Sequence, residues 1–104
     1  LNAQFNLGSL YLDGQGTQVS VLEGVNWFTQ AAKNGHANSA YTLAKMHQEG
    51  DFVDSDLVLA HAWAAQSEIN EHPEASLLKK EIAQDLSEAE IRQARRIFAA
   101  WQIE

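Results

Sequence analysis

Residues 2–16 read NAQFNLGSLYLDGQG, and a related pattern returns 36 positions later in the chain. The two copies, residues 1–36 and 37–72, share several identical residues at this offset. The identical pairs are Leu7 and Leu43, Gly14 and Gly50, Trp27 and Trp63, His36 and His72, and Asn2 and Asn38. A fixed period of this length predicts stacked structural repeats, in which each unit buries its apolar face against a neighbour.

The composition favours a small helical protein. The chain has 104 residues, of which 45% are hydrophobic, one is proline and none is cysteine. A chain this short has a thin core, so its stability must come from repeats that pack on their neighbours. The lack of cysteine excludes disulfides, thiol catalysis and zinc–thiolate sites. No apolar run approaches the roughly 20 residues that a membrane-spanning helix needs.

The charge distribution bears on the class of partner. The formal net charge is −7, and up to residue 76 only two basic residues stand against nine acidic ones. An acidic surface repels phosphate backbones, so we expect no nucleic-acid partner, and a neutral or basic protein ligand fits better. The sequence leaves the compartment open, because a soluble protein of this composition suits both the bacterial periplasm and the cytoplasm.

The first copy is predicted to form two helices. Apolar residues at helical spacing predict a first helix that ends at Gly14. Ser20, followed three residues later by Glu23, is a capping-box pattern and predicts the start of the second helix, which Gly35 ends. The apolar positions of this predicted hairpin are Ala3, Leu7, Leu10, Tyr11, Val21, Val25, Trp27, Phe28, Ala31 and Ala32.

The second copy repeats this arrangement with an acidic loop. Its first helix is predicted to end at Gly50, and either Asp54 or Ser55 is expected to cap the next helix. Trp27 and Trp63 hold the same place in the second helix of each hairpin, so we expect both to be buried between hairpins. The other apolar positions of this copy are Ala40, Leu43, Ala44, Met46, Leu57, Ala60 and Ala64.

Residues 73–104 depart from the repeat and are predicted to close the array. Pro73 suits the first turn of a helix, and Ser87 with Glu90 forms a second capping-box pattern at the start of the last helix. The predicted buried stripes are Ala75, Leu78, Ile82 and Leu86, then Ile91, Ala94, Phe98 and Trp101. We expect this hairpin to cap the array. We also expect the two repeats and the cap to form one structural domain, which is part of a longer protein.

The first copy closely resembles the Sel1-like repeat family, a branch of the tetratricopeptide superfamily. The second copy is a degenerate match, in which Ser39 replaces Ala3 and Phe52 stands at the place of Gly16. The segment AHAWAAQS and the closing helix resemble the last repeats of bacterial members. The matching residues are Ala3, Leu7, Gly8, Tyr11, Gly14, Gly16, Trp27, Ala31, Ala32, Gly35 and either Ala37 or Ala40, with Leu43, Gly50 and Trp63 as structural positions of the second copy.

This resemblance implies an all-α fold, a right-handed α/α superhelix of about six helices, and a function. The family implies a non-catalytic scaffold or adaptor that binds a peptide or partner protein in a concave groove lined by the first helix of each hairpin. The groove positions would be Asn2, Phe5, Ser9, Leu12 and Asp13, then Asn38, Tyr41, Lys45, Gln48 and Glu49, with Leu77, Glu81, Gln84 and Asp85 extending the line.

Two roles remain open for individual groove positions. The amides of Asn2 and Asn38 can pair with the backbone of an extended peptide, because an amide both donates and accepts hydrogen bonds. Phe5 and Tyr41 fit ligand contact and half-buried packing equally well. The alternative function is that of a structural cap for a longer array, which self-associates through its N-terminal edge.

The remaining chemistry-bearing patterns favour simple structural roles. The four histidines lack the spacing of a helical metal site, and the acids at positions 49, 51, 54 and 56 do not follow the order of a calcium-binding loop. The sequence contains no nucleophile elbow or phosphate-binding loop, so we expect no enzyme, cofactor or metal. The basic cluster of the last hairpin is expected to solvate the cap rather than to bind an acidic partner or membrane headgroups. It comprises Lys79, Lys80, Arg92, Arg95 and Arg96.

Overall fold

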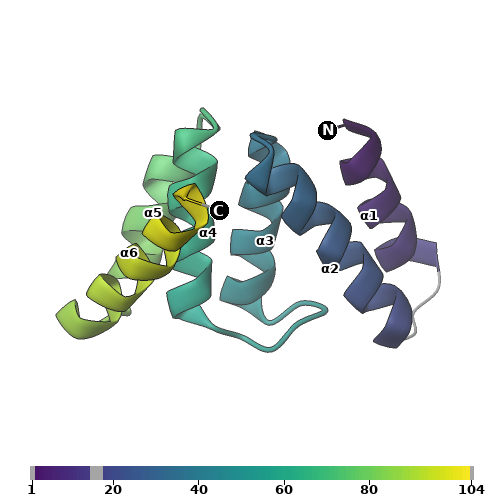
Figure 1. Cartoon of the computed structure of the whole chain (residues 1–104). Helices are drawn as coiled ribbons and strands as arrows, with labels where there is room; N and C mark the ends of the chain where they lie inside the picture. Colours follow the sequence, from purple (N-terminus) through teal and green to yellow (C-terminus); the bar gives the residue numbers. More distant parts are fainter. Residues whose placement is uncertain (1, 15–17, 104) are drawn as a thin grey trace.

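The computed structural model describes residues 2–14 and 18–103, with side chains described for residues 3–11 and 21–103. The described chain forms six helices and measures 38 × 24 × 24 Å, which confirms the all-α prediction. The helices are α1 (Asn2–Gly14), α2 (Gln18–Lys33), α3 (Ala37–Glu49), α4 (Leu57–Ile69), α5 (Ala75–Ala83) and α6 (Glu88–Gln102). They follow one another along the molecule as stacked antiparallel helices (Figure 1).

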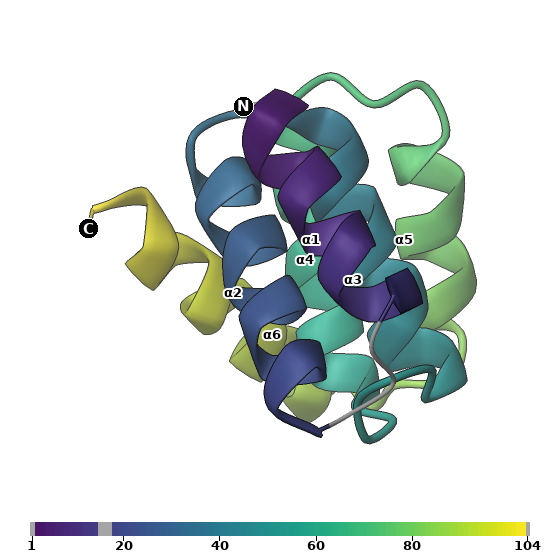
Figure 2. The ribbon, with the colours of Figure 1, turned by 90° about the vertical axis from the view of Figure 1, so that its right-hand side faces the viewer.

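The packing order places α3 and α4 at the centre of the molecule. Helix α1 packs on α2, α2 packs on α3, and α3 makes its most extensive contacts with α4. Helices α5 and α6 both pack against α4 and lie on either side of it (Figure 2). The last pair of helices therefore covers α4 from two sides. None of the helices in the described residues is long and apolar enough to cross a membrane.

Several helix ends are built as the sequence predicts. Gly35 and Gly50 follow α2 and α3 with φ values of 100° and 74°, a left-handed conformation that favours glycine. Gly50 donates its backbone N–H to the Met46 carbonyl oxygen at 2.8 Å. At α6, the Ser87 side chain accepts from the Glu90 N–H at 3.1 Å, and the Glu90 carboxylate accepts from the Ser87 N–H at 2.9 Å. The predicted capping box of the last helix is confirmed.

Three predicted helix starts are wrong by one or two residues. Helix α2 begins at Gln18, so Ser20 lies within its first turn. Helix α4 is capped by Asp56, whose side chain accepts from the Leu59 N–H at 3.1 Å, and not by Asp54 or Ser55. Pro73 lies in the turn before α5, which begins two residues later at Ala75. Each error falls where neighbouring residues all suit the end of a helix.

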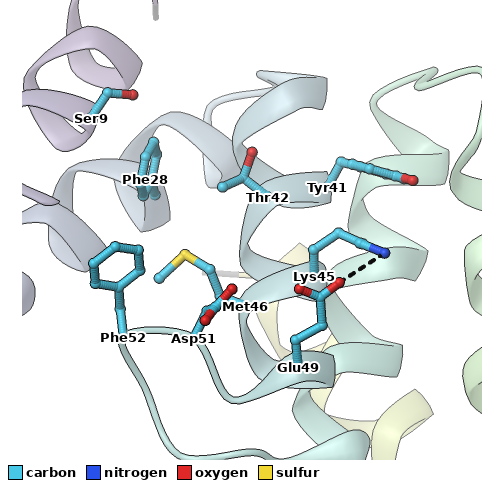
Figure 3. Close-up of a pocket in the computed structure, with 9 residues that line it drawn as sticks. All are labelled: Ser9, Phe28, Tyr41, Thr42, Lys45, Met46, Glu49, Asp51 and Phe52. Carbon is cyan, nitrogen blue, oxygen red and sulfur yellow. Dashed lines mark ion pairs between the residues drawn. The ribbon is translucent and has the colours of Figure 1, made fainter. Parts of the chain in front are cut away.

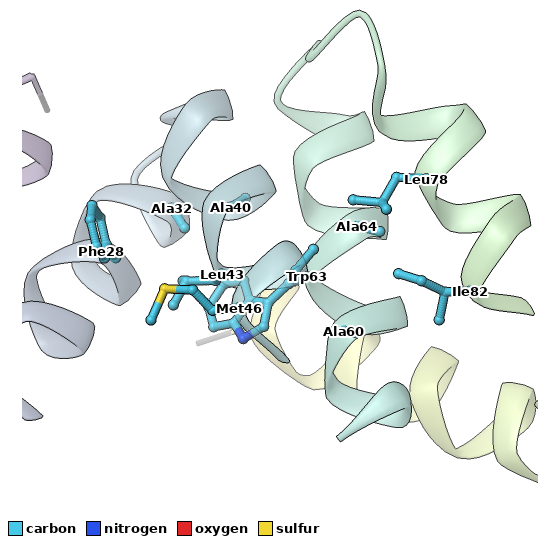
Figure 4. Close-up of a cluster of buried hydrophobic side chains, with 11 residues drawn as sticks. Phe28, Ala32, Ala40, Leu43, Met46, Ala60, Trp63, Ala64, Leu78 and Ile82 are labelled. Atoms are coloured by element: carbon cyan, nitrogen blue, oxygen red, sulfur yellow. The ribbon is translucent and has the colours of Figure 1, made fainter. Parts of the chain in front are cut away.

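The hydrophobic core runs through α2, α3, α4 and α5 (Figure 4). Alanines at the contacts between these helices are completely buried, and such small side chains let the helix backbones approach closely. The cluster of buried residues comprises Phe28, Ala32, Ala40, Leu43, Ala44, Met46, Ala60, Trp63, Ala64, Leu78 and Ile82. The predicted burial of Ala31, Ala75 and Ala94 is also confirmed.

Several apolar positions predicted for the first copy are exposed or only half-buried, and Leu10 among them is 68% exposed. Trp27 is only half-buried, and its neighbour Phe28 takes the buried position of α2. Leu7 is 38% exposed, whereas its counterpart Leu43 is 1% exposed. The physical reason is the number of neighbours, since α3 lies between α2 and α4 while α1 packs chiefly on α2.

Other first-copy positions support the contact between α1 and α2. A Cβ atom at Gly8 would lie 3.0 Å from the Gly24 carbonyl oxygen, so glycine allows this close approach. Tyr11 is half-buried. Its side-chain hydrogen bond with Glu23, together with the negative charge of that carboxylate, raises the pKa of Tyr11 above its usual value. Helix α1 ends at Gly14, as predicted.

Candidate partner-binding groove

Two open hollows lie side by side along α3. The first, which we call the Phe52 hollow, has a volume of about 370 Å³ and lies between α1, α2, α3 and the loop that follows α3. The second, the Glu81 hollow, has a volume of about 350 Å³ and lies between α3 and α5. The Phe52 hollow is lined by Ser9, Phe28, Tyr41, Thr42, Lys45, Met46, Glu49, Asp51 and Phe52 (Figure 3). The Glu81 hollow is lined by Tyr41, Lys45, Glu74, Leu77, Leu78 and Glu81.

Helix α3 supplies the side chains that join the two hollows. Tyr41, Lys45 and Glu49 are spaced four residues apart, so they form one line along the helix. Tyr41 and Lys45 line both hollows, which makes the two hollows parts of one groove. The Lys45 Nζ lies 3.2 Å from a carboxylate oxygen of Glu49 (Figure 3).

The Tyr41 ring is fixed by its surroundings. It stacks on the His72 imidazole with a centroid distance of 4.0 Å and an angle of 5° between the planes. Its hydroxyl donates to the Glu74 carboxylate at 3.5 Å. His72 in turn accepts a hydrogen bond on Nδ1 from the Glu74 N–H at 3.1 Å. Tyr41 therefore has the packing role that the sequence left open, and it also lines the groove, while its contact with a ligand remains a prediction.

The equivalent ring of the first copy, Phe5, packs on neighbouring rings and lines neither hollow. Phe5 lies 5.2 Å from the Phe28 ring and 5.2 Å from the His36 ring, measured between centroids. His36 Nδ1 accepts from the Ser39 N–H at 3.2 Å and so caps α3. The aromatic–histidine contact thus recurs at the two turns between hairpins, and it ties each hairpin to the next.

The groove carries an excess of negative charge. Among the described residues that line the two hollows, Glu49, Asp51, Glu74 and Glu81 are acidic and Lys45 is the basic one. Lys45 is already paired with Glu49, so among the described lining residues no further cation faces the remaining carboxylates. The groove therefore favours a neutral or cationic occupant.

The structure brings together part of the predicted groove set. Ser9, Tyr41, Lys45 and Glu49 line the Phe52 hollow, and Leu77 and Glu81 line the Glu81 hollow. Phe5, Asn38, Gln48, Gln84 and Asp85 line neither hollow, and the side chains of Asn2, Leu12 and Asp13 lie outside the described residues. The role of the predicted set in binding remains a prediction.

Seven residues that line the groove were not predicted as groove positions, namely Phe28, Thr42, Met46, Asp51, Phe52, Glu74 and Leu78. Phe28 and Met46 were predicted as core residues, and they are buried, but their side chains also form the floor of the Phe52 hollow. Phe52 and Glu74 lie in turns, whose conformation the helical periodicity does not specify. Phe52 could have been identified from the sequence, because an aromatic residue stands there in place of Gly16 of the first copy.

The four histidines lie outside the groove lining. Burial lowers the pKa of His36, His47 and His61, and the positive charges of Lys79 and Arg95 lower the pKa of His61 further. His61 is buried between α4 and α6, with its Nδ1 lacking a hydrogen-bond partner. Across the described ranges, no group of three or more His, Asp or Glu side chains is arranged to hold a metal ion.

Comparisons with known proteins extend these observations. A family model for the Sel1 repeat matches residues 1–36 and again residues 37–67. The alginate biosynthesis protein AlgK of Azotobacter vinelandii is 28% identical over 101 residues. That alignment covers 97% of this chain and 22% of AlgK, so the chain spans about a fifth of the length of this relative.

Proposed function

Because the chain belongs to the Sel1 repeat family, we propose that it is a non-catalytic interaction module that holds a peptide or protein segment along the groove. Sel1 repeats generally mediate protein–protein interactions. The observation that carries the proposal is the continuity of the two hollows, which share Tyr41 and Lys45 and extend from α1 to α5.

The groove is suited to binding because its walls are already ordered. The Tyr41 ring is held by its stack on His72, and the floor at Phe28 and Met46 belongs to the packed core. A preformed site loses less conformational entropy on binding than a site that must fold around its ligand. A segment of a partner could therefore bind by surface complementarity alone, as a scaffold or adaptor requires.

The proposal predicts that binding depends on the line of side chains that joins the hollows. We expect peptides selected from a displayed random library against the chain to lose at least about tenfold in affinity for a Tyr41→Ala/Leu77→Ala variant, because both side chains line the Glu81 hollow. Fluorescence anisotropy measures the affinities. Gln93→Ala, an exposed position of α6 outside both hollows, is the matched control and should bind as the unmodified chain does.

Circular dichroism must show that the double variant remains folded, because Tyr41 is half-buried. Equal affinities for the double variant and the control would contradict a groove-binding function. Failure of the library to yield any peptide that binds the chain would contradict it as well.

A second candidate function is self-association, which would link two copies of a longer array. Leu7 and Leu10 of α1 and Leu22 of α2 are exposed, and exposed clusters of apolar residues mark interaction sites. A second copy could bury the same leucines from both sides in a symmetric contact.

Self-association predicts a concentration-dependent dimer in sedimentation equilibrium. We expect Leu10→Glu to restore the monomer, because the charge would be buried unpaired in the contact. Leu77→Glu, which places the same charge on an exposed leucine of α5, should leave the dimer unchanged. A chain that sediments as a monomer at every concentration would exclude this candidate.

A further inference from the structure

The turn after α3 holds an aromatic residue in a conformation that favours glycine. Phe52 has a φ of 65°, in the left-handed region, and its side chain is 53% exposed. Both features are unfavourable for a phenylalanine, which normally avoids positive φ and prefers to be buried. The first copy has a glycine, Gly16, at the equivalent position of the sequence. Strained backbone conformations are concentrated at functional sites, so the exposed Phe52 ring is a candidate for contact with a ligand.

The exposed ring forms one wall of the Phe52 hollow. Figure 3 shows the Phe52 ring beside the thioether of Met46, with Phe28 above them on α2. Phe28 is 2% exposed and belongs to the core, so this wall is fixed, while the unbranched Met46 side chain can adapt to a ligand. The volume of about 370 Å³ lies at the lower end of the range of pockets that bury small ligands. The hollow therefore suits one bulky apolar side chain.

The charges next to this apolar wall favour cations. Glu49 and Asp51 line the same hollow, and Glu74 and Glu81 follow in the Glu81 hollow. Lys45 neutralises part of this charge through its contact with Glu49. A segment that binds here gains from basic residues, which complement the carboxylates and speed association.

We propose that the groove recognises a segment with a bulky apolar residue, which inserts beside Phe52, flanked by basic residues, which face Glu74 and Glu81. This assignment rests on the proposed groove-binding function and adds the class of partner to it. Phe52 is the residue that determines the apolar preference, and the carboxylates determine the charge preference.

The chain contains a matched control for the backbone conformation of Phe52. Glu71 has a φ of 71° and occupies the position at which the first copy has Gly35. It is exposed and lines neither hollow. Phe52→Gly and Glu71→Gly therefore relieve the same type of backbone strain, and only the first removes a wall of the hollow.

The test measures binding of three labelled synthetic peptide pools by fluorescence anisotropy. The first pool has a central tryptophan flanked by lysines, the second replaces the tryptophan with alanine, and the third replaces the lysines with glutamate. We expect the unmodified chain to bind the first pool at least about tenfold more tightly than either of the others. Phe52→Gly should remove the preference for tryptophan without lowering the melting temperature. Glu71→Gly should raise the melting temperature and retain the preference.

Two results would overturn the assignment. One is an unmodified chain that binds the three pools equally, and the other is a folded Phe52→Gly variant that retains the preference for tryptophan. If Phe52→Gly melts at a lower temperature, Phe52→Asn replaces it, because asparagine tolerates the left-handed region better than most residues. If either result is found but peptide binding still depends on Tyr41 and Leu77, the assignment fails and the groove-binding function stands. Peptide binding that is independent of both residues would contradict the groove-binding function and the assignment together.

Discussion

Replacing Trp63 with alanine is expected to lower the free energy of unfolding by about 3–5 kcal/mol. Trp63 is 5% exposed and belongs to the central cluster with Leu43 and Met46. Its ring also stacks on Trp101 at a centroid distance of 4.1 Å, so it joins α4 to α6. Alanine would leave a cavity and remove that stacked pair. Urea denaturation followed by far-ultraviolet circular dichroism measures the loss.

Trp27→Ala is the matched control for this prediction. Trp27 holds the same place in the 36-residue repeat, but it is only half-buried. We expect its replacement to cost about 1–2 kcal/mol, in proportion to the smaller apolar area that it removes from water. Equal losses in the two variants would contradict the structural difference between the two tryptophans. An unchanged midpoint for Trp63→Ala would contradict its position in the core.

The two tryptophans also show what the sequence could predict of the fold. Periodicity identified both residues as apolar positions of a second helix, and both lie on such a helix. The burial of each tryptophan depends in addition on which elements pack against its helix, and the sequence repeat does not contain this information. Trp63 has α6 beside it through Trp101, whereas the first copy has a different residue, Phe28, at the core. Identical residues at equivalent positions of a repeat therefore predict equivalent helices, but they do not predict equal burial.

The helix ends were predictable where the determining residues are local. The capping box of Ser87 and Glu90 needs only two side chains and the backbone between them, and its pattern located it correctly. The same pattern at Ser20 and Glu23 did not mark the start of α2, which begins at Gln18. In the loop before α4, several suitable capping residues follow one another, and local chemistry does not choose among them. Asp56 is the residue that caps α4, and its N–H donates to the His47 carbonyl oxygen of α3 at 2.9 Å, a contact between distant residues that local sequence does not reveal.

The groove was predictable in part for the same reason. Tyr41, Lys45 and Glu49 share one face of α3, so helical spacing groups them correctly. The opposite wall of the Phe52 hollow comes from α2 and from a turn, which reach the same place only in the folded chain. Asn38 lies on the predicted helix but lines neither hollow. Helical spacing therefore predicts which residues share a helix face more reliably than it predicts which of them line a groove.

Replacing Leu43 with alanine is expected to destabilise the chain by about 2–5 kcal/mol. Leu43 is 1% exposed, at the centre of the cluster between α2 and α4. Three elements would lose contacts at once, and they are held together by the rest of the core, so the cavity cannot close fully. The free energy of unfolding of a small domain is only about 5–15 kcal/mol, so this single change removes a large fraction of the total stability.

Leu7→Ala separates burial from residue type, because the same change is made at the same place of the first copy. Leu7 is 38% exposed, so we expect a loss of about 1 kcal/mol or less. Urea midpoints of the two variants, measured at the same temperature, give the comparison directly. A loss for Leu7→Ala that equals the loss for Leu43→Ala would mean that α1 is covered in solution, by a second copy or by another surface. Because the second-copy explanation requires a dimer, the dependence of the Leu7→Ala midpoint on protein concentration would then decide between the two.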